Sequence, residues 1–391
     1  MLAGGGARGA YEVGALSALA PALAARGKEP DIVVGTSIGA LNGAFFAARA
    51  HEPLEATAAG AVEMWRELRW SDALRPLVSP FELSRLLGAG AMLAGLPGAD
   101  VSGLLDSSPL RETLERVVAF EQIARNVKDG SLTAAAVVAT AYATTRSVVF
   151  HHGGPKPPLD AMHAIEYFAT AIAPEHVLAS AAIPGAFPAV EIREPGAAAG
   201  WYGDGGVRLN APLAPALALG AERVVAIGLN SSVTRTRPLV RPDALDGVAQ
   251  LLQVVLADQL AEDVATLAAV NETLPHASST ARRGAGRKRR GRIPYIFIAP
   301  GDRLEIGRLA RDVYKRHYAG ITGLVRDTDL ALFGRIVNAE RSSIHGELLS
   351  YLFLAREFID DLIALGRRDA ERWLDARHDA GLWQIGRLPA G

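Results

Sequence analysis

The chain has 391 residues, of which 49% are hydrophobic, 40 are glycine and none is cysteine. This length and apolar content suffice for one large domain with an appendage, and they exclude a chain that is disordered throughout. The lack of cysteine excludes disulfides, cysteine metal sites and a cysteine nucleophile. The formal net charge of −1 gives no overall field that would recruit nucleic acid or a membrane.

A glycine-rich segment, Gly4-Gly5-Gly6-Ala7-Arg8-Gly9, follows Leu2 and Ala3 at the start of the chain. Such a loop can adopt positive φ and turn several backbone N–H groups toward one point, which makes an anion-binding nest. Apolar residues then recur at helical spacing from Ala10 to Leu23. The pattern predicts a loop followed by a helix.

The next segment predicts a buried strand, a sharp turn and a second helix. Ile32 to Val34 are β-branched, and Ala40 to Ala48 are helix-compatible. Between them lies Gly35-Thr36-Ser37-Ile38-Gly39, a Gly-x-Ser-x-Gly pattern. In a nucleophile elbow of this kind, the glycines allow a tight turn and the serine hydroxyl is exposed at the helix N-terminus. An ordinary turn with a capping serine remains the alternative from this pentapeptide alone.

The first 45 residues thus predict a β-loop-α-β-turn-α unit, which implies a parallel sheet. The same loop also reads as G-x-G-x-x-G at Gly4, Gly6 and Gly9. A dinucleotide site would need an acidic residue near the end of the second strand, whereas Asp31 opens that strand. The nucleotide interpretation is therefore only weakly supported.

Further strands are predicted in the middle of the chain. Segments 132–140 and 147–150 would form a hairpin, and a strand at 190–193 precedes Trp201-Tyr202-Gly203-Asp204-Gly205-Gly206. This run places one carboxylate in a glycine turn after an aromatic strand. Asp in such a turn often only forms the turn. Strands at 222–229 and 293–298 follow.

The C-terminal part differs in residue composition from the segments before it. Residues 281–292 form a basic segment without large apolar side chains, which we expect to be a mobile surface loop. Arg282 to Arg292 could contact anionic lipid headgroups or be merely solvated. We expect residues 1–302 to form a catalytic domain. Residues 303–391 would form a helical extension packed on it, with helices near 308–318, 344–365 and 367–380.

No apolar run approaches the roughly 20 residues of a membrane span, and no basic and apolar leader precedes the glycine loop. We therefore expect a cytoplasmic or peripheral membrane protein without a signal peptide.

The glycine loop, the serine elbow and the aspartate turn together contain the parts of an acyl-transfer site. Ser37 would be the nucleophile, and Asp204 would take its proton. The N–H groups of Gly5, Gly6 and Ala7 would bind the oxyanion of the tetrahedral intermediate. Arg8 would hold the loop or add to its field.

These motifs resemble the patatin-like phospholipase family. The resemblance includes the glycine loop, the elbow, the block Ala179-Ser180-Ala181-Ala182-Ile183-Pro184-Gly185-Ala186-Phe187-Pro188, and Asp204-Gly205-Gly206 followed by Asn210-Ala211-Pro212. It implies a three-layer α/β/α fold with a mostly parallel central sheet and a Ser37–Asp204 dyad, with the oxyanion loop on Gly4 to Gly9. It further implies hydrolysis of fatty-acyl esters in phospholipids or other lipids, without a metal or organic cofactor.

Two alternatives remain open. One is a catalytically weak lipid-binding or scaffold protein that uses the same site. The other is a His-assisted α/β-hydrolase, for which the histidines after the serine are His151, His152, His163, His176, His276, His317, His345 and His378. Family members usually have a full strand before the loop, whereas here only Leu2 and Ala3 represent it. A segment upstream could therefore carry a strand or a targeting signal.

Overall fold

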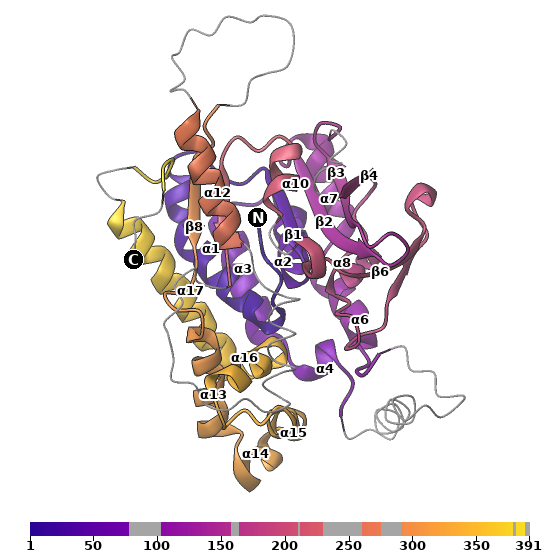
Figure 1. Cartoon of the computed structure of the whole chain (residues 1–391), viewed down its shortest axis with the longest axis vertical. Coiled ribbons are helices and arrows are strands. Elements are labelled where there is room, and N and C mark those ends of the chain that lie inside the picture. Colours follow the sequence, from indigo (N-terminus) through magenta and orange to yellow (C-terminus); the bar gives the residue numbers. More distant parts are fainter. Residues whose placement is uncertain are drawn as a thin grey trace, which may run out of the picture.

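The computed structural model describes residues 1–77, 103–157, 164–209, 212–229, 260–274, 291–377 and 381–387. Helices flank a central sheet, and a helical C-terminal region extends from one end of it (Figure 1). The expected mixed α/β fold with a helical C-terminal region is thereby confirmed.

The central sheet is joined through the first residues of the chain. Strands β4, β3, β2, β6 and β5 are neighbours in that order, β1 also pairs with β2, and β7 pairs with β8. Leu2 forms parallel bridges to both Gly35 and Ile227, so it connects β1 to β7. The strands are β1 (Ile32–Thr36), β2 (Ala134–Ala141), β3 (Ser147–Gly153), β4 (Ile165–Ala169), β5 (Val190–Ile192), β6 (Gly200–Asp204), β7 (Val224–Ile227) and β8 (Tyr295–Ile298).

The sheet is mostly parallel, as expected. Strand β1 is parallel to β2, β3 to β4 and β7 to β8, and the two bridges of Leu2 are also parallel. The antiparallel pairs are β2–β3, β2–β6 and β5–β6. The predicted hairpin of β2 and β3 is therefore present. Strand β6 pairs with β2 directly beyond the positions that β1 occupies, which places Asp204 at the end of β1 where the elbow begins.

Helices cover both faces of this sheet. The side chains of β2 alternate, because successive residues in a strand point to opposite faces. Ala134, Ala136 and Val138 pack with Ala216 and Leu219 on one face, whereas Ala135, Val137 and Ala139 join the larger core on the other. The described helices of the N-terminal part are η1 (Gly6–Arg8), α1 (Gly9–Ala24), α2 (Ile38–Ala48), α3 (Leu54–Glu67), α4 (Trp70–Ala73), α6 (Ser108–Val117), α7 (Phe120–Asp129), α8 (Pro174–Ala181), η2 (Gly196–Ala198), α9 (Gly206–Leu209), α10 (Leu213–Ala218) and α12 (Leu260–Thr273).

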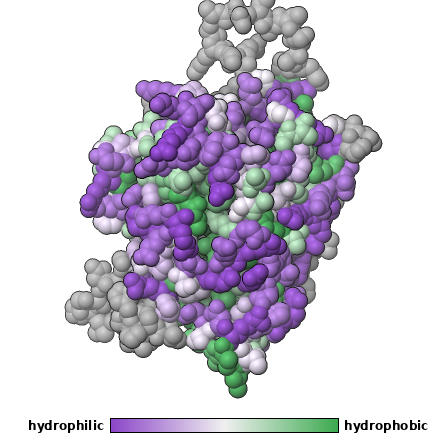
Figure 2. Space-filling model, turned by 180° about the vertical axis from the view of Figure 1, so that it is seen from behind, coloured by the Kyte–Doolittle hydropathy of each residue, from purple (hydrophilic) through white to green (hydrophobic). Residues whose placement is uncertain are grey.

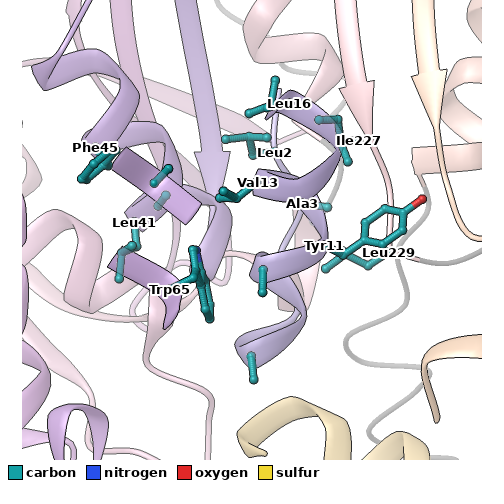
Figure 3. Packing of buried hydrophobic residues seen from close by; sticks show 14 of the residues in the cluster. Leu2, Ala3, Tyr11, Val13, Leu16, Leu41, Phe45, Trp65, Ile227 and Leu229 are labelled. Atoms are coloured by element: carbon teal, nitrogen blue, oxygen red, sulfur yellow. The ribbon is translucent and has the colours of Figure 1, made fainter. Parts of the chain in front are cut away.

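Helix α1 lies at the centre of the larger core. Its residues Val13 and Leu16 are buried and lie close to Leu2, and the buried Tyr11 lies beside Leu229 (Figure 3). The C-terminal helices are α13 (Glu305–His317), α14 (Gly320–Arg326), α15 (Thr328–Ile336), α16 (Ser343–Leu352) and α17 (Arg356–Ala376). The last of them packs along α1, and the Tyr11 hydroxyl donates to Asp369 at 2.8 Å.

The helix expected at 344–365 is interrupted, and the prediction of a second helix starting at 367 was wrong. Helix α16 ends at Leu352, and α17 runs without a break from Arg356 to Ala376. The side chain of Phe353 is fully buried in the intervening segment, where its ring contacts those of Tyr314, Tyr318 and Phe358. The aromatic cluster thus explains the position of the break.

None of the described helices is both long enough and apolar enough to cross a bilayer.

The contact between α1 and α17 depends on glycine. A Cβ at Gly366 would lie 2.1 Å from the carbonyl oxygen of Tyr11, and one at Gly14 would lie 2.2 Å from that of Ile363. We expect Gly366→Ala to lower the free energy of unfolding by about 1–3 kcal/mol, because the helices must separate to admit the methyl group. Urea denaturation measures this change.

Gly196→Ala is the matched control, because a Cβ there meets no atom within 4 Å. Equal denaturation midpoints for the two variants would contradict the close approach of α1 and α17.

Candidate active site

Ser37 lies in a strained turn between β1 and α2. Its φ of 53° and ψ of −122° fall outside the helical and strand regions, and few non-glycine residues adopt a positive φ. The turn is so tight that a Cβ at Gly35 would lie 2.1 Å from the carbonyl oxygen of Gly39. Ser37 therefore lies at the apex of a tight turn between a strand and a helix.

A buried serine from another element holds this turn. The backbone N–H of Ser37 donates to Ser180 Oγ at 2.7 Å, and that hydroxyl donates to the carbonyl oxygen of Val138 at 2.5 Å. Ser180 is fully buried in α8. It therefore connects the elbow to β2 and occupies the N–H group of Ser37, which is not available to a substrate oxygen. Ser180 belongs to the motif block from Ala179 to Pro188, but no sequence pattern assigns it a role.

Asp204 ends β6 directly opposite the elbow. Its Oδ2 accepts a hydrogen bond from Ser37 Oγ at 2.6 Å, and its Oδ1 accepts one from the Gly206 N–H at 2.6 Å. A Cβ at Gly205 would lie 2.2 Å from the carbonyl oxygen of Val138, so glycine is required in this turn. Both predicted residues, from positions 167 apart in the chain, are thus in direct contact.

The C-terminal end of α8 also fixes the aspartate. The Asp204 N–H donates to the carbonyl oxygen of Ala182 at 2.8 Å, and the Gly205 N–H donates to that of Ser180 at 3.3 Å. One short segment therefore binds the backbone of both the serine and the aspartate.

Burial raises the pKa of the Asp204 carboxyl from 3.8 to about 6, because desolvation disfavours its charged form. Hydrogen bonds from Ser37 and Gly206 oppose this shift but only in part. A carboxylate with a pKa near 6 is a better proton acceptor than an ordinary aspartate and is still largely ionised at neutral pH.

The glycine loop faces the same point. Gly4, Gly5 and Gly6 line a small cavity together with Ser37, Asp204, Ile183 and Tyr351. Gly6 has a φ of 62°, Gly5 is the N-cap of η1, and Gly6 and Ala7 are its first two residues. The amides of these three residues donate to no acceptor in the part of the chain that the structure describes. Gly5 and Gly6 therefore carry amides without an acceptor at the cavity that Ser37 also lines.

The C-terminal region covers one side of the cavity. Its volume is about 10 Å³, which is roughly the space of one water molecule. Tyr351, at the end of α16, lies over Gly6, where a Cβ would be 2.0 Å from the Tyr351 carbonyl oxygen. A space of this size does not hold an acyl chain.

Arg8 holds the loop to that cover. Its Nε donates to Ser350 Oγ at 2.8 Å, and its Nη2 donates to both the carbonyl oxygen and the Oε2 of Glu347, at 2.9 and 2.7 Å. The guanidinium also stacks over the Tyr351 ring at 4.0 Å. Of the two roles expected for Arg8, the contacts favour holding the loop. No motif in the sequence marked Glu347, Ser350 or Tyr351.

The described histidines lie elsewhere. His151 contacts the Gly153 carbonyl oxygen, His176 packs against Phe150, and His345 contacts the Val337 carbonyl oxygen. Among the described residues no histidine is hydrogen-bonded to Ser37 or Asp204. His163, His276 and His378 lie outside the described residues. The described ranges also contain no group of three or more His, Asp or Glu side chains arranged to hold a metal ion.

A larger cavity, of about 490 Å³, lies at the opposite end of the parallel strands. It is lined by residues such as Asp31 and Val224, at or beside the starts of β1 and β7. Ligand sites in open α/β sheets form at the carboxyl ends of the strands, where Ser37 lies. The small cavity is therefore the candidate active site despite its size.

Comparisons with known proteins bear on the family of the chain. A family model described as Patatin-like phospholipase matches residues 1–217, which is more than half of the chain. No curated protein sequence matches the chain significantly. Among solved structures, the crystal structure of VipD from Legionella pneumophila is similar at 14% sequence identity and a TM-score of 0.31. That match covers 77% of this chain and 60% of the VipD chain, and its TM-score is too low to support an argument.

The raised pKa of Asp204 has a measurable effect on stability. A carboxyl with a pKa of about 6 in the folded protein and 3.8 when unfolded stabilises the fold below pH 4, and this stabilisation is lost as the pH rises through 6. This difference between the two pKa values of Asp204 corresponds to about 3 kcal/mol in the free energy of unfolding. We expect Asp204→Asn to remove this loss, since the amide carries no charge.

Urea denaturation of both proteins from pH 4 to pH 7 isolates this group. The stability of the wild type relative to Asp204→Asn should fall with rising pH. A difference that is constant over this range would show that Asp204 titrates as an ordinary carboxyl.

Proposed function

The chain belongs to the patatin-like phospholipase family, and on this basis we propose that it is a lipid acyl hydrolase of the phospholipase A or lysophospholipase type. The observation that carries the proposal is the 2.6 Å hydrogen bond from Ser37 Oγ to Asp204 Oδ2, between two buried side chains. The free amides of the glycine loop beside this pair support the same reaction class.

In the proposed first step, Ser37 Oγ attacks the ester carbonyl carbon while its proton moves to Asp204. The carbonyl oxygen becomes an oxyanion, which the Gly5, Gly6 and Ala7 amides would stabilise. When the tetrahedral intermediate collapses, the bond to the alcohol oxygen breaks, and this oxygen takes the proton from Asp204. The products are an acyl-Ser37 ester and a free alcohol, such as a lysolipid.

In the second step, water attacks the acyl-Ser37 ester and Asp204 accepts its proton. Collapse of the second intermediate releases the fatty acid and returns the proton to Ser37 Oγ, which regenerates the free serine. No metal or organic cofactor takes part in this scheme. Its chemical parts are therefore confined to the elbow, the aspartate turn and the glycine loop.

A carboxylate can serve as the base here for two reasons. Burial raises the pKa of Asp204 to about 6, which brings it closer to the pKa of the serine hydroxyl. The oxyanion donors lower the remaining activation barrier, since one such donor contributes about 3–4 kcal/mol to transition-state stabilisation.

A second candidate function follows from the small cavity. With Tyr351 over the glycine loop, a space of about 10 Å³ admits no acyl ester, so this arrangement of the site would turn over little lipid. A scaffold protein, or a lipid-binding protein that uses the same site once Tyr351 has moved, is therefore the second candidate. The intact serine, aspartate and free loop amides favour the enzyme.

We extend the proposal to the organisation of the chain. Residues 1–302 would carry the chemistry, and residues 303–391 would form a helical extension whose α16 covers the site and whose α17 packs on α1. Of the basic segment from Arg282 to Arg292, only Gly291 and Arg292 lie in the described residues, so its contact with anionic lipid remains a prediction.

The direct test is the release of free fatty acid from phospholipids, lysophospholipids and neutral lipids, with wild type and Ser37→Ala compared. We expect release by the wild type from at least one glycerophospholipid or lysophospholipid, and a loss of at least about 1,000-fold in the variant, because the nucleophile is removed.

Release that persists in Ser37→Ala would disprove the role of this serine. A folded wild type that binds lipid vesicles but releases no fatty acid from any of these lipids would favour the binding protein instead.

Ser180 provides a separate test, because it positions the elbow without reaching the substrate. Ser180→Ala leaves the Ser37 N–H without its acceptor and frees the strained turn, so we expect kcat to fall by about 10- to 100-fold with little change in KM. Ser180→Thr retains the hydroxyl and should restore much of the rate. Ser17→Ala is the matched control, because it removes a serine hydroxyl that donates to a backbone carbonyl outside the site.

A variant Ser180→Ala that is less stable but has normal kcat per folded molecule would show that Ser180 is only structural.

A further inference from the structure

Helices α14 and α15 form a projection at one end of the molecule with apolar side chains on its surface. Ile321 is 80% exposed and Val325 is 85% exposed, the largest values for any large hydrophobic residue in the described ranges. Ile336, at the end of α15, is 59% exposed. Arg335 donates to the carbonyl oxygen of Gly320 at 2.9 Å, which places the end of α15 beside the start of α14. We call Ile321, Val325 and Ile336 the apolar tip.

The tip is visible in both views of the molecule. Helices α14 and α15 lie at the lower end in Figure 1, beyond α13 and α16. Figure 2 shows a hydrophobic protrusion at the same end, on a surface that is otherwise mainly hydrophilic. Its convex shape leaves no groove for a peptide, whereas a projecting apolar point suits a lipid bilayer, which closes around what enters it.

Packing within α14 fixes this orientation. Ile321 and Val325 are four residues apart and therefore share one helix face. On the other face, a Cβ at Gly323 would lie 1.9 Å from the carbonyl oxygen of Tyr318, so the glycine must face the protein. The smallest residue is thus inside and the two β-branched aliphatic residues are outside. This is the reverse of the usual arrangement of a surface helix.

Basic side chains surround the apolar tip. Lys315 and Arg316 are exposed in the last turn of α13, and Arg326 and Arg335 are exposed at the ends of α14 and α15. Two of these cations are paired within the fold, Arg316 with Asp361 and Arg326 with Glu357, whereas Lys315 and Arg335 form no ion pair among the described residues. The nearby acids are also used, because Asp312 pairs with Arg311, Asp327 accepts from the Leu330 N–H and Asp329 from the Leu77 N–H. Lys315 and Arg335 are therefore the cations that remain available to anionic headgroups.

The same region is connected to the candidate active site. Glu347 of α16 accepts from the Gly307 N–H of α13 at 2.7 Å and pairs with Arg8 of the glycine loop. Helix α13 leads directly into α14. The apolar tip thus has a defined position relative to the loop that lines the small cavity.

We propose that the apolar tip inserts into the surface layer of an anionic lipid bilayer, with Lys315 and Arg335 at the level of the headgroups. Insertion would bring the candidate active site to a surface that contains its substrate, and this role rests on the proposed function. The insertion itself does not depend on it. A second copy of this chain is the other occupant that an exposed apolar surface could have.

The test measures co-flotation of the full chain with vesicles of phosphatidylcholine, with and without 30% phosphatidylserine. All proteins carry Ser37→Ala, so that no lipid is consumed. We expect binding to the anionic vesicles, and at least a tenfold loss when Ile321→Ser and Val325→Ser are combined. Val270→Ser is the matched control, because Val270 is 48% exposed on α12, away from the tip. This variant should bind within twofold of its parent.

Lys315→Gln combined with Arg335→Gln should weaken the preference for the anionic vesicles. Unchanged binding by the double serine variant would overturn the proposal, including the case in which another basic segment provides all of the binding. A parent protein that is dimeric by light scattering and becomes monomeric with the serine substitutions, with vesicle binding unchanged, would assign the tip to a second copy instead.

The two proposals can fail separately. In the background that retains Ser37, the double serine variant should hydrolyse a soluble short-chain ester at the wild-type rate and vesicle lipid at least tenfold more slowly. Absence of hydrolysis on both substrates by the wild type contradicts the proposed function. The flotation result still decides the insertion of the tip.

Discussion

The hydrogen bond from Ser37 to Asp204 is the interaction on which the rest of the site depends. It joins two buried side chains, and its donor is held at a positive φ that a serine adopts only under constraint. The carboxyl loses hydration, which raises its pKa to about 6. The buried carboxylate beside the serine hydroxyl therefore lowers the free energy of unfolding at neutral pH. This combination is expected of a functional site and has no evident structural purpose.

Three separated elements supply that geometry. Strand β1 delivers the serine, β6 delivers the aspartate, and the end of α8 binds the backbone of both through Ser180 and Ala182. Glycine is needed where backbones come together, at Gly35 and Gly205 in the site and at Gly366 between α1 and α17. The C-terminal region belongs to the same arrangement, because Arg8 anchors the glycine loop to α16 and Tyr351 covers the cavity. Helix α16 therefore holds the glycine loop and borders the cavity.

Local sequence patterns predicted the parts of the site but not its contact with α16. The elbow around Ser37, the turn at Asp204 and the glycine loop each have a signal within a few residues, and the patatin-like motifs gave their common order. The contact of Arg8 with Glu347 joins positions 339 apart, and no local pattern encodes it. The break after α16 was also missed, because the aromatic cluster around Phe353 forms only in the folded chain. Ser180 lies in a recognised motif, but its hydrogen bond with the Ser37 N–H joins positions 143 apart, which no local pattern encodes.

The most direct test of the account is the rate at which a fluorophosphonate probe modifies Ser37, measured on the wild type and on Asp204→Asn. Peptide mass spectrometry would locate the adduct. We expect a single adduct on Ser37 and a rate at least about 100-fold lower in the variant, since the amide accepts no proton from the serine. Modification of both proteins at the same rate, or an adduct on a different residue, would contradict the claim that Asp204 activates Ser37.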